Sequence, residues 1–420
     1  MKIIDIRVTP VAMSDPPLLN AAGVHAAYAL RTVVEIVTDD GVCGLGEVPG
    51  SAATTAALES AAQVIVDADP FARRLIAGRL EELGERMDWN HGTLMRVSSA
   101  IDVACHDIVG KATGRPVCDL LGGAVRERVD FAAYLFFKEA GAGGELGYDT
   151  DPTATGWAAA RQARAHTPQE VVAQARAMCD EFGFRSIKLK GGAFPPDHEV
   201  AAIRALRNSF GPDVPLRLDP NAIWSLDTAV TAGKELRGLL EYYEDPVRGQ
   251  EAMADVARRV GLPLATNMCT TAYDHLPGSI RLGSERIILV DHHAWGGLLP
   301  AIELDRVCRT FGRELSMHSN SHLGISLAAM VHLAAASPSL AYAVDTHYPW
   351  QIDDVIAGGR LRIEDGALPV SHEPGLGVEL DRDALARLHD NYLRCGFTDR
   401  NDETEMQKIS PGWKFEPVRW

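Results

Sequence analysis

The sequence predicts an α/β barrel, because short apolar runs alternate with helical segments through the middle of the chain and each run ends in a polar residue. The runs lie at residues 129–137, 186–190, 215–221, 241–246, 263–267, 286–291, 314–319 and 342–346. Strands that alternate with helices are typical of parallel βα units.

The polar residues that close seven of these runs recur at nearly constant steps. They are Lys190, Asp219, Glu244, Asn267, Asp291, His318 and Asp345, which are 29, 25, 23, 24, 27 and 27 residues apart. A (β/α)₈ barrel uses about 30 residues per unit, and the carboxyl ends of its strands meet on one face, where active sites lie. The regular spacing therefore predicts that these seven residues form one site at the rim of the barrel.

The segments on either side of the barrel are predicted to form a second unit. Residues 1–125 should make an α+β domain, with alternating strands at 2–13 and 32–38 and helices from about 54 to 121. The barrel is placed at 126–370, with a long irregular stretch at 138–168 of the kind that often forms a lid. Residues 371–420 should return to the first domain. They should contain a helix at 382–395, and the aromatic stretch 409–413 should pack against the first domain.

The composition of the chain limits the kinds of molecule that the protein is expected to bind. The 420 residues are 46% hydrophobic, with a mean hydropathy of -0.06 and a net charge of -16. This charge argues against a nucleic-acid partner, which needs a basic surface. No apolar run approaches the ~18 residues of a membrane helix, and the alternating start of the chain differs from a signal peptide. Seven cysteines without a CxxC pair favour neither a disulfide framework nor a zinc ribbon. We expect a cytoplasmic protein without a membrane or nucleic-acid partner.

The strand Ser186–Lys190 carries two lysines. Lys188 and Lys190 point to the same side of a strand, and mutual repulsion should lower the pKa of at least one of them. A lysine that is neutral near pH 7 can act as a general base. The alternative is a solvated edge strand.

Three consecutive strand ends offer oxygen ligands, which suit Mg²⁺ better than zinc. These are Asp219, Glu244 and Asn267, and Asn221 could face the same site. Each alone is also an ordinary turn residue. On the next two strands, Asp291 can orient the imidazole of His318 and raise its basicity.

A zinc site is disfavoured, although histidines are dense here. Adjacent residues on a strand point to opposite sides, so His292 and His293 should diverge. His318 and His322 should straddle a strand end and a loop. A divalent cation between two bases instead suits removal of a proton α to a carboxylate, with positive charge placed where the enolate develops.

With these motifs the chain resembles the mandelate-racemase-like branch of the enolase superfamily, and it is similar to the glucarate dehydratase family in particular. Asn267 matches the family's asparagine ligand, where most relatives have a carboxylate. The matching stretches are 24–26, 46–50, 134–137, 188–192, 218–221, 265–268, 318–320, 345–347 and 411–413.

The resemblance implies a (β/α)₇β barrel with an α+β capping domain formed by the N-terminal region and the C-terminal tail. It implies Mg²⁺ bound by Asp219, Glu244 and Asn267, and an acid-sugar substrate that loses water to give a keto-deoxy sugar acid. Separately from the resemblance, we expect a homo-oligomer, because barrels of this size commonly associate. The implied catalytic residues are Lys190, Lys188, His318, Asp291 and Asn221, with Lys188 beside the substrate carboxylate. The implied substrate contacts are His25, Tyr134, Lys188, Asn221, Asn320, His347 and Arg400.

The chain also departs from the family pattern. It has Gly324 where the family has an acidic residue, and His292-His293 where the family has a Pro-His step. Two other functions remain open. One is a racemase or epimerase that uses the same two opposed bases, and the other is a catalytically silent relative that binds acid sugars.

Overall fold

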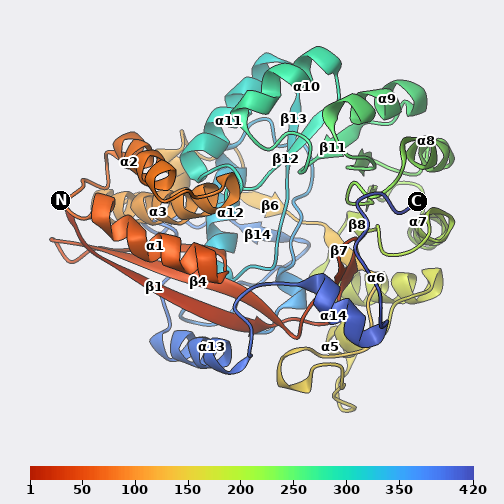
Figure 1. The fold of residues 1–420 in the computed structure, drawn as a ribbon, viewed down its shortest axis with the longest axis horizontal. Coiled ribbons are helices and arrows are strands. Elements are labelled where there is room, and N and C mark those ends of the chain that lie inside the picture. The colour runs from red at the N-terminus through yellow and green to blue at the C-terminus, as the bar shows by residue number, and fades with distance from the viewer.

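A computed structural model describes all 420 residues. Its N-terminal region is built on an antiparallel sheet of order β1-β4-β5, with helices packed on one face (Figure 1). The elements are β1 Ile3–Ser14, β4 Tyr28–Thr38, β5 Cys43–Pro49, α1 Ala52–Ile65, α2 Arg73–Arg86, α3 His91–Thr113 and α4 Val117–Leu120. The run Val33–Val37 suits a strand because β-branched residues pack well on a pleated surface. Ser51 and Asn90 cap α1 and α3 through their side chains. A short hairpin of β2 (Leu19–Asn20) and β3 (Gly23–Val24) follows β1.

The C-terminal part of the chain returns to this sheet. α13 (Arg382–Arg394) packs on β1, where the ring Nδ1 of His389 lies 2.7 Å from the Pro10 carbonyl oxygen. α14 (Asp402–Ile409) lies against β3 (Figure 1). The sequence predicts that the C-terminal tail packs on the first domain, but its last residues continue to the barrel. The guanidinium of Arg419 donates to the Ala21 carbonyl, while its backbone N–H donates to Ile223 on a barrel loop.

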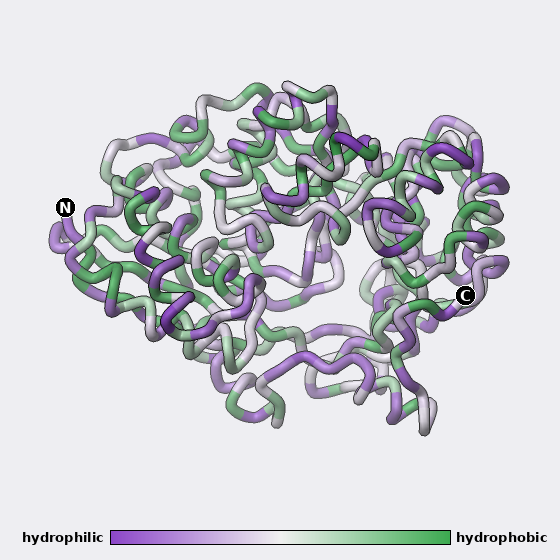
Figure 2. Tube along the Cα trace, turned by 45° about the horizontal axis from the view of Figure 1, so that its top comes forward, coloured by the Kyte–Doolittle hydropathy of each residue, from purple (hydrophilic) through white to green (hydrophobic).

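The barrel contains seven parallel strands whose spatial order follows the sequence. They are β7 Ala133–Phe136, β8 Ile187–Lys190, β9 Leu216–Asp219, β10 Tyr242–Glu244, β11 Leu264–Thr266, β12 Ile287–Val290 and β13 Glu314–Met317. The connecting helices are α6 Pro168–Phe182, α7 Pro196–Phe210, α8 Leu226–Glu235, α9 Gln250–Val260, α10 Leu276–Leu282, α11 Leu298–Thr310 and α12 Gly324–Ala336. Many of these helices alternate hydrophilic and hydrophobic residues along their turns (Figure 2), as amphipathic helices with one face on a sheet do.

Residues 340–345 close the barrel without forming a regular strand. The segment forms two isolated parallel bridges. Leu340 pairs with Leu315 of β13, and Val344 pairs with Phe131, just before β7. No helix follows it before a single 3₁₀ turn at Tyr348–Trp350. The fold is therefore the predicted (β/α)₇β barrel with an α+β capping domain.

The predicted first strand, 129–137, is divided in two. Its start, β6 (Arg128–Asp130), leaves the barrel and pairs with β14 (Ala367–Pro369) in an antiparallel ladder. Only β7 belongs to the barrel, because the chain changes sheets between the two pieces.

The segment predicted to be a lid is a packed element. It contains a 3₁₀ turn at Gly144–Leu146 and the helix α5 (Gly156–Gln162). Trp157 donates to Pro349 O, and the buried Arg161 donates to Ala142 O. The ammonium of Lys138 is enclosed and donates to the carbonyl of Ala163, and burial lowers the pKa of Lys138 to about 7. No helix has the length and apolar run needed to span a bilayer.

Asp107 joins three parts of the capping region. From α3, its buried carboxylate accepts hydrogen bonds from the backbone N–H of Leu45 at 3.0 Å and of Leu376 at 2.8 Å. The ammonium of Lys111 donates a third hydrogen bond to this carboxylate, at 2.9 Å. The carboxylate thus ties α3 to β5 and to the C-terminal segment.

Replacing Asp107 by alanine should destabilise the protein by about 2 to 4 kcal/mol, because two buried N–H groups lose their acceptor. Urea unfolding measures the change. The exposed Asp119 provides the control, since surface substitutions usually change stability by less than about 0.5 kcal/mol. Equal effects of Asp107→Ala and Asp119→Ala would contradict this role.

Candidate active site

A cavity of about 370 Å³ lies where the barrel strand ends meet the capping region. It is bordered by parts of the chain that are far apart in sequence. The predicted site residues in its lining are His25, Tyr134, Lys190, Asn221, His318, Asn320, His347 and Arg400. The other predicted site residues connect to this lining through ion pairs and hydrogen bonds: Lys188, Asp219, Glu244, Asn267 and Asp291. The structure thus brings all of them to one region.

The three predicted metal ligands stand at the ends of adjacent strands. Asp219 ends β9, Glu244 ends β10 and Asn267 directly follows β11. Both carboxylates are fully buried, and the side-chain amide of Asn267 lies 3.3 Å from Glu244 Oε1.

The backbone beyond these strand ends is strained. Asn221, Ala222 and Asp245 have φ angles of 60°, 57° and 35°, in the left-handed region that residues with a Cβ rarely adopt. Such strain persists where the surrounding structure enforces it, and it is frequent at functional sites. Ala222 N–H donates to Asp245 O, which joins the two strained turns.

The paired lysines do not behave as the sequence predicts. Lys188 is fully buried, and its ammonium lies 2.5 Å from Asp345 Oδ2 and 2.6 Å from Glu244 Oε2. Lys190 lies 2.6 Å from Asp219 Oδ2. Burial favours the neutral amines, but these carboxylates outweigh it and raise the pKa of both lysines. Lys188 does lower the pKa of Lys190, as expected from repulsion, yet by less than Asp219 raises it.

The predicted pair of Asp291 and His318 forms directly. His318 Nδ1 lies 3.0 Å from Asp291 Oδ2, so Nε2 is the ring nitrogen left for a substrate. Asn320 donates to the same oxygen at 3.1 Å. Burial alone would raise the pKa of Asp291, but the adjacent His293 and His318 hold that pKa well below its usual range. The carboxylate stays ionised and fixes the orientation of His318.

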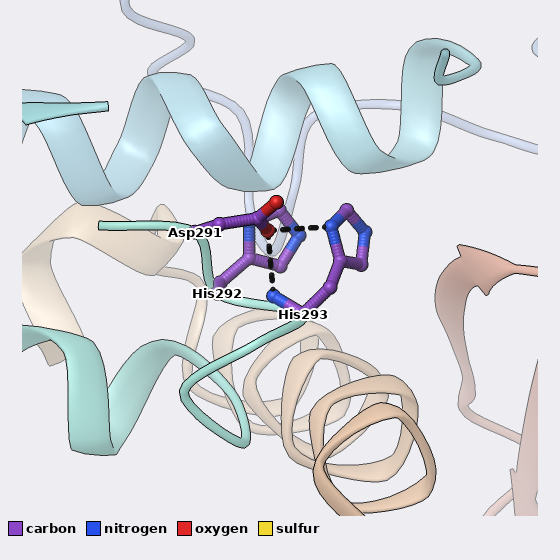
Figure 3. Close-up of side chains that lie close together, drawn as sticks. All are labelled: Asp291, His292 and His293. Carbon is purple, nitrogen blue, oxygen red and sulfur yellow. Dashed lines mark hydrogen bonds and ion pairs between the residues drawn. The ribbon is translucent and has the colours of Figure 1, made fainter. Parts of the chain in front are cut away.

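His292 and His293 do not point to opposite sides, contrary to the sequence prediction. β12 ends at Val290, so both histidines lie in a turn, and their ring centroids are 3.9 Å apart with the ring planes tilted by 36° (Figure 3). Together with Asp291, they could place three metal-ligating atoms close together.

The contacts of His293 argue against a metal ion in this cluster. Its Nδ1 lies 2.8 Å from Asp291 Oδ1, and its Nε2 lies 3.2 Å from the Arg31 guanidinium. Ser326 Oγ and the Glu47 carbonyl oxygen are both 3.1 Å from Nε2 as well. Neither nitrogen is free to bind a cation, and the positive charge of Arg31 would repel one.

Several predicted substrate contacts are held by partners that the sequence pattern does not reveal. Asp15 Oδ2 lies 2.8 Å from His25 Nδ1. Arg400 forms two hydrogen bonds with Asp402, and this pairing lowers the pKa of Asp402 to about 2 despite its burial. His347 lies with its ring centroid 4.8 Å from that of Tyr134, and burial keeps its pKa well below the ordinary value.

Residues that the sequence analysis missed also border the cavity: Asn20, Ala22, Phe136, Ser319 and Asp402. None of them is one of the regularly spaced polar residues that close the predicted strands. At most, they are sequence neighbours of such residues. Asp345 does close one of the predicted strands, but its ion pair with Lys188, on the other side of β7, was not predicted.

The donor set at the strand ends fits Mg²⁺. Two carboxylates and an amide oxygen are hard oxygen ligands, and the site adjoins a cavity with room for substrate and water. Glu244 Oε2 is ion-paired with Lys188 at 2.6 Å, but it accepts no well-formed hydrogen bond, and a carboxylate oxygen has a second lone pair that can bind a cation. The amide of Asn267 would present its oxygen after rotating about its terminal bond.

Comparison with known proteins identifies the family. Residues 3–122 match the mandelate racemase / muconate lactonizing enzyme N-terminal domain, and residues 170–384 match the enolase C-terminal domain-like family. A protein of Streptomyces coelicolor named probable glucarate dehydratase is 43% identical over 100% of this chain and 99% of its own. The hydrophobic dipeptide epimerase of Enterococcus faecalis is 26% identical over 90% of this chain and 99% of its own.

Two solved structures are also similar. An enolase of Thermobispora bispora, complexed with magnesium and formate, has a TM-score of 0.93 and 50% identity and covers 100% of both chains. An enolase of Pseudomonas fluorescens, with bound magnesium, potassium and tartrate, has a TM-score of 0.93 and 44% identity and covers 100% of this chain and 99% of its own. The chain therefore belongs to the mandelate-racemase-like branch of the enolase superfamily, in the glucarate dehydratase family.

Proposed function

We propose that the protein is a Mg²⁺-dependent dehydratase of acid sugars, with glucarate the first substrate to test. The observation that carries this proposal is the placement of Lys190 and His318 on different walls of one cavity, with Asp219, Glu244 and Asn267 beside them. Lys190 ends the second barrel strand and His318 follows the seventh, so the two bases approach a substrate from different directions. The 43% identity to a probable glucarate dehydratase supports the reaction class.

Each residue has a distinct role in this proposal. Lys190 or His318 removes the proton α to the substrate carboxylate, depending on the configuration at that carbon. Lys188 contributes a buried positive charge beside the same carboxylate. His318, held by Asp291, then donates a proton from Nε2 to the departing β-hydroxyl, which leaves as water. This proton is the one that His318 has removed, or one that His318 already carries when Lys190 is the base. The enol then tautomerises to a 2-keto-3-deoxy acid.

Mg²⁺, held by Asp219, Glu244 and Asn267, would supply the positive charge that orients the substrate carboxylate and stabilises the enolate. Asp219 is also the main attraction that raises the pKa of Lys190. With Asp219 engaged as a metal ligand, its attraction on Lys190 would be weaker, and burial and the charge of Lys188 would favour the neutral amine of Lys190.

A racemase or epimerase is the second candidate, because the same two bases can remove a proton on one face and return it on the other. An epimerase among the relatives supports this alternative. The presence of both Lys190 and His318 in the cavity argues against a catalytically silent binder.

Incubation with Mg²⁺ and a panel of mono- and diacid sugars in D₂O should distinguish these functions. We expect a 2-keto-3-deoxy acid, detected by its carbonyl chemistry and by NMR. Deuterium at the α-carbon without this product would instead indicate the epimerase. Absence of both product and exchange for every acid sugar would contradict both enzymatic functions.

Lys190→Ala should reduce proton exchange from one epimer at the α-carbon of the substrate by about 10²- to 10⁴-fold, the usual contribution of a general base. Exchange from the other epimer should persist, since His318 remains. NMR on a pair of aldarates that are epimeric at the α-carbon measures both rates. Lys234→Ala, at an exposed lysine of α8, is the control. Loss of both rates to the same extent would show that Lys190 is not one of two independent bases.

Asp219→Ala should abolish both turnover and the thermal stabilisation by Mg²⁺. A ligand at 100 times its Kd stabilises a protein by about 2.7 kcal/mol, and differential scanning fluorimetry with Mg²⁺ or EDTA detects this shift. Asp291→Asn is a matched control, because it alters a buried carboxylate that the proposal does not assign to the metal. If Asp291→Asn removed the shift and Asp219→Ala retained it, the cation would belong to the histidine cluster.

A further inference from the structure

The short hairpin of β2 and β3 contributes to the wall of the active-site cavity. Its residues Asn20 and Ala22 border the cavity. The base of the hairpin is fixed, because the N–H of Leu19 donates to the Phe137 carbonyl at 2.8 Å. The tip is the two-residue turn formed by Ala21 and Ala22. The position of this tip therefore determines how well the wall encloses the cavity.

The tip of the hairpin rests on the barrel loop that follows Lys190. Gly192 in this loop has a φ of 76°, and a Cβ there would lie 3.1 Å from Ala21 Cβ and 3.2 Å from Ile223 Cγ2. Ile223 belongs to the loop after Asp219. Gly192 thus marks the point where the hairpin meets two barrel loops, and each of these loops follows a residue of the proposed site.

Arg419, in the C-terminal tail, binds all three of these segments. The tail runs from α14 past β8 to the side of α7 and α8 (Figure 1). The guanidinium of Arg419 donates to the Ala21 carbonyl at 2.9 Å and to the Gly192 carbonyl at 3.4 Å. Its backbone N–H donates to the Ile223 carbonyl at 2.9 Å. One residue therefore connects the hairpin with both barrel loops.

The side chain of Arg419 is itself held in place. Its guanidinium carbon lies 4.8 Å from the ring centroid of Trp413 and 5.2 Å from that of Trp420, and the faces of aromatic rings attract cations. The N–H of Ser225 donates to the backbone oxygen of Trp420 and so fixes the tail next to Arg419. The guanidinium is thus oriented before a substrate binds.

The barrel loop at Gly192 has its own support from the opposite side. Glu199, fully buried in the first turn of α7, accepts hydrogen bonds at 3.0 Å from the N–H groups of Gly192, Ala193 and Phe194. This loop is therefore a firm base to which Arg419 can attach the hairpin.

We propose that Arg419 is a positioning residue that latches the β2–β3 hairpin onto the barrel and so keeps the active-site cavity enclosed. The hairpin side chain of Asn20 donates to Asp402 at 2.7 Å, which ties it to α14 rather than to the barrel. The latch does not depend on which substrate binds, so the inference goes beyond the proposed function. Without the guanidinium the closed hairpin becomes less populated, and the affinity for a substrate falls in proportion to the closed fraction.

Hydrogen–deuterium exchange of the ligand-free protein tests the latch directly. In Arg419→Ala, the amides of residues 19–24 should exchange about 10- to 100-fold faster, as expected when hydrogen bonds from a charged group are lost. The amides of β8 and β9 should exchange as before. Arg419→Lys keeps the charge and a donor, and it should restore part of the protection. Lys414→Ala, at an exposed lysine of the same tail, is the matched control.

Steady-state kinetics with glucarate and Mg²⁺ provide a readout that a general loss of stability would not produce. In Arg419→Ala, KM should rise about tenfold, because only the closed fraction binds well. The kcat should change by less than about twofold, since saturating substrate favours the closed hairpin.

Unchanged exchange at residues 19–24, or faster exchange spread evenly over the whole chain, would overturn the inference. A fall in kcat with an unchanged KM would overturn it as well. The proposed function fails by a different observation, namely the absence of any 2-keto acid product from the wild-type enzyme. The exchange comparison needs no substrate and would still decide whether Arg419 holds the hairpin.

Discussion

The buried ammonium of Lys188 organises the centre of the barrel. It lies within 4 Å of carboxylates from three other strands: Asp219, Glu244 and Asp345. Without a cation here, three carboxylates would face one another in a region shielded from water, at a large electrostatic cost. Lys188 therefore holds together the strand ends that form the proposed metal site.

Carboxylates outnumber cations at this centre. Lys188 and Lys190 face Asp219, Glu244 and Asp345, while the buried Arg217 lies 3.6 Å from Asp345 and pairs with Glu241 at 2.8 Å. The group therefore retains negative charge, which favours the entry of a cation at the proposed metal site.

The regular spacing of the polar residues that close the predicted strands was enough to predict which side chains gather at the rim, because parallel barrel strands end on one face. Asp219, Glu244, Asp291 and His318 all lie there. The raised pKa of Lys188 was not predictable in this way. Its partner Asp345 is 157 residues away in the sequence and meets it only because the barrel closes.

Local patterns also failed where the chain leaves regular structure. Alternation along a strand placed His292 and His293 on opposite sides, but β12 ends before them and their rings lie in contact, with centroids 3.9 Å apart. Gly324 is another such position. A Cβ there would lie 2.5 Å from Ile356 Cδ1, and the Gly324 N–H donates to Asp354. This contact brings the carboxylate of Asp354, 30 residues further along the chain, to Gly324, and no local motif reveals it.

Glu47 shows why the barrel alone does not position the pair of Asp291 and His318. Its carboxylate accepts from the backbone of Leu323 and Ser326 at the start of α12, where a helix favours negative charge. It also holds Arg31, which contacts His293, and His293 in turn holds Asp291. The capping region therefore reaches the residue that orients His318 through a continuous chain of buried polar contacts. Because each member is satisfied by the next, the loss of one leaves a buried charge unpaired and disturbs the rest. The position of His318 thus depends on the capping domain as well as on the strand from which it projects.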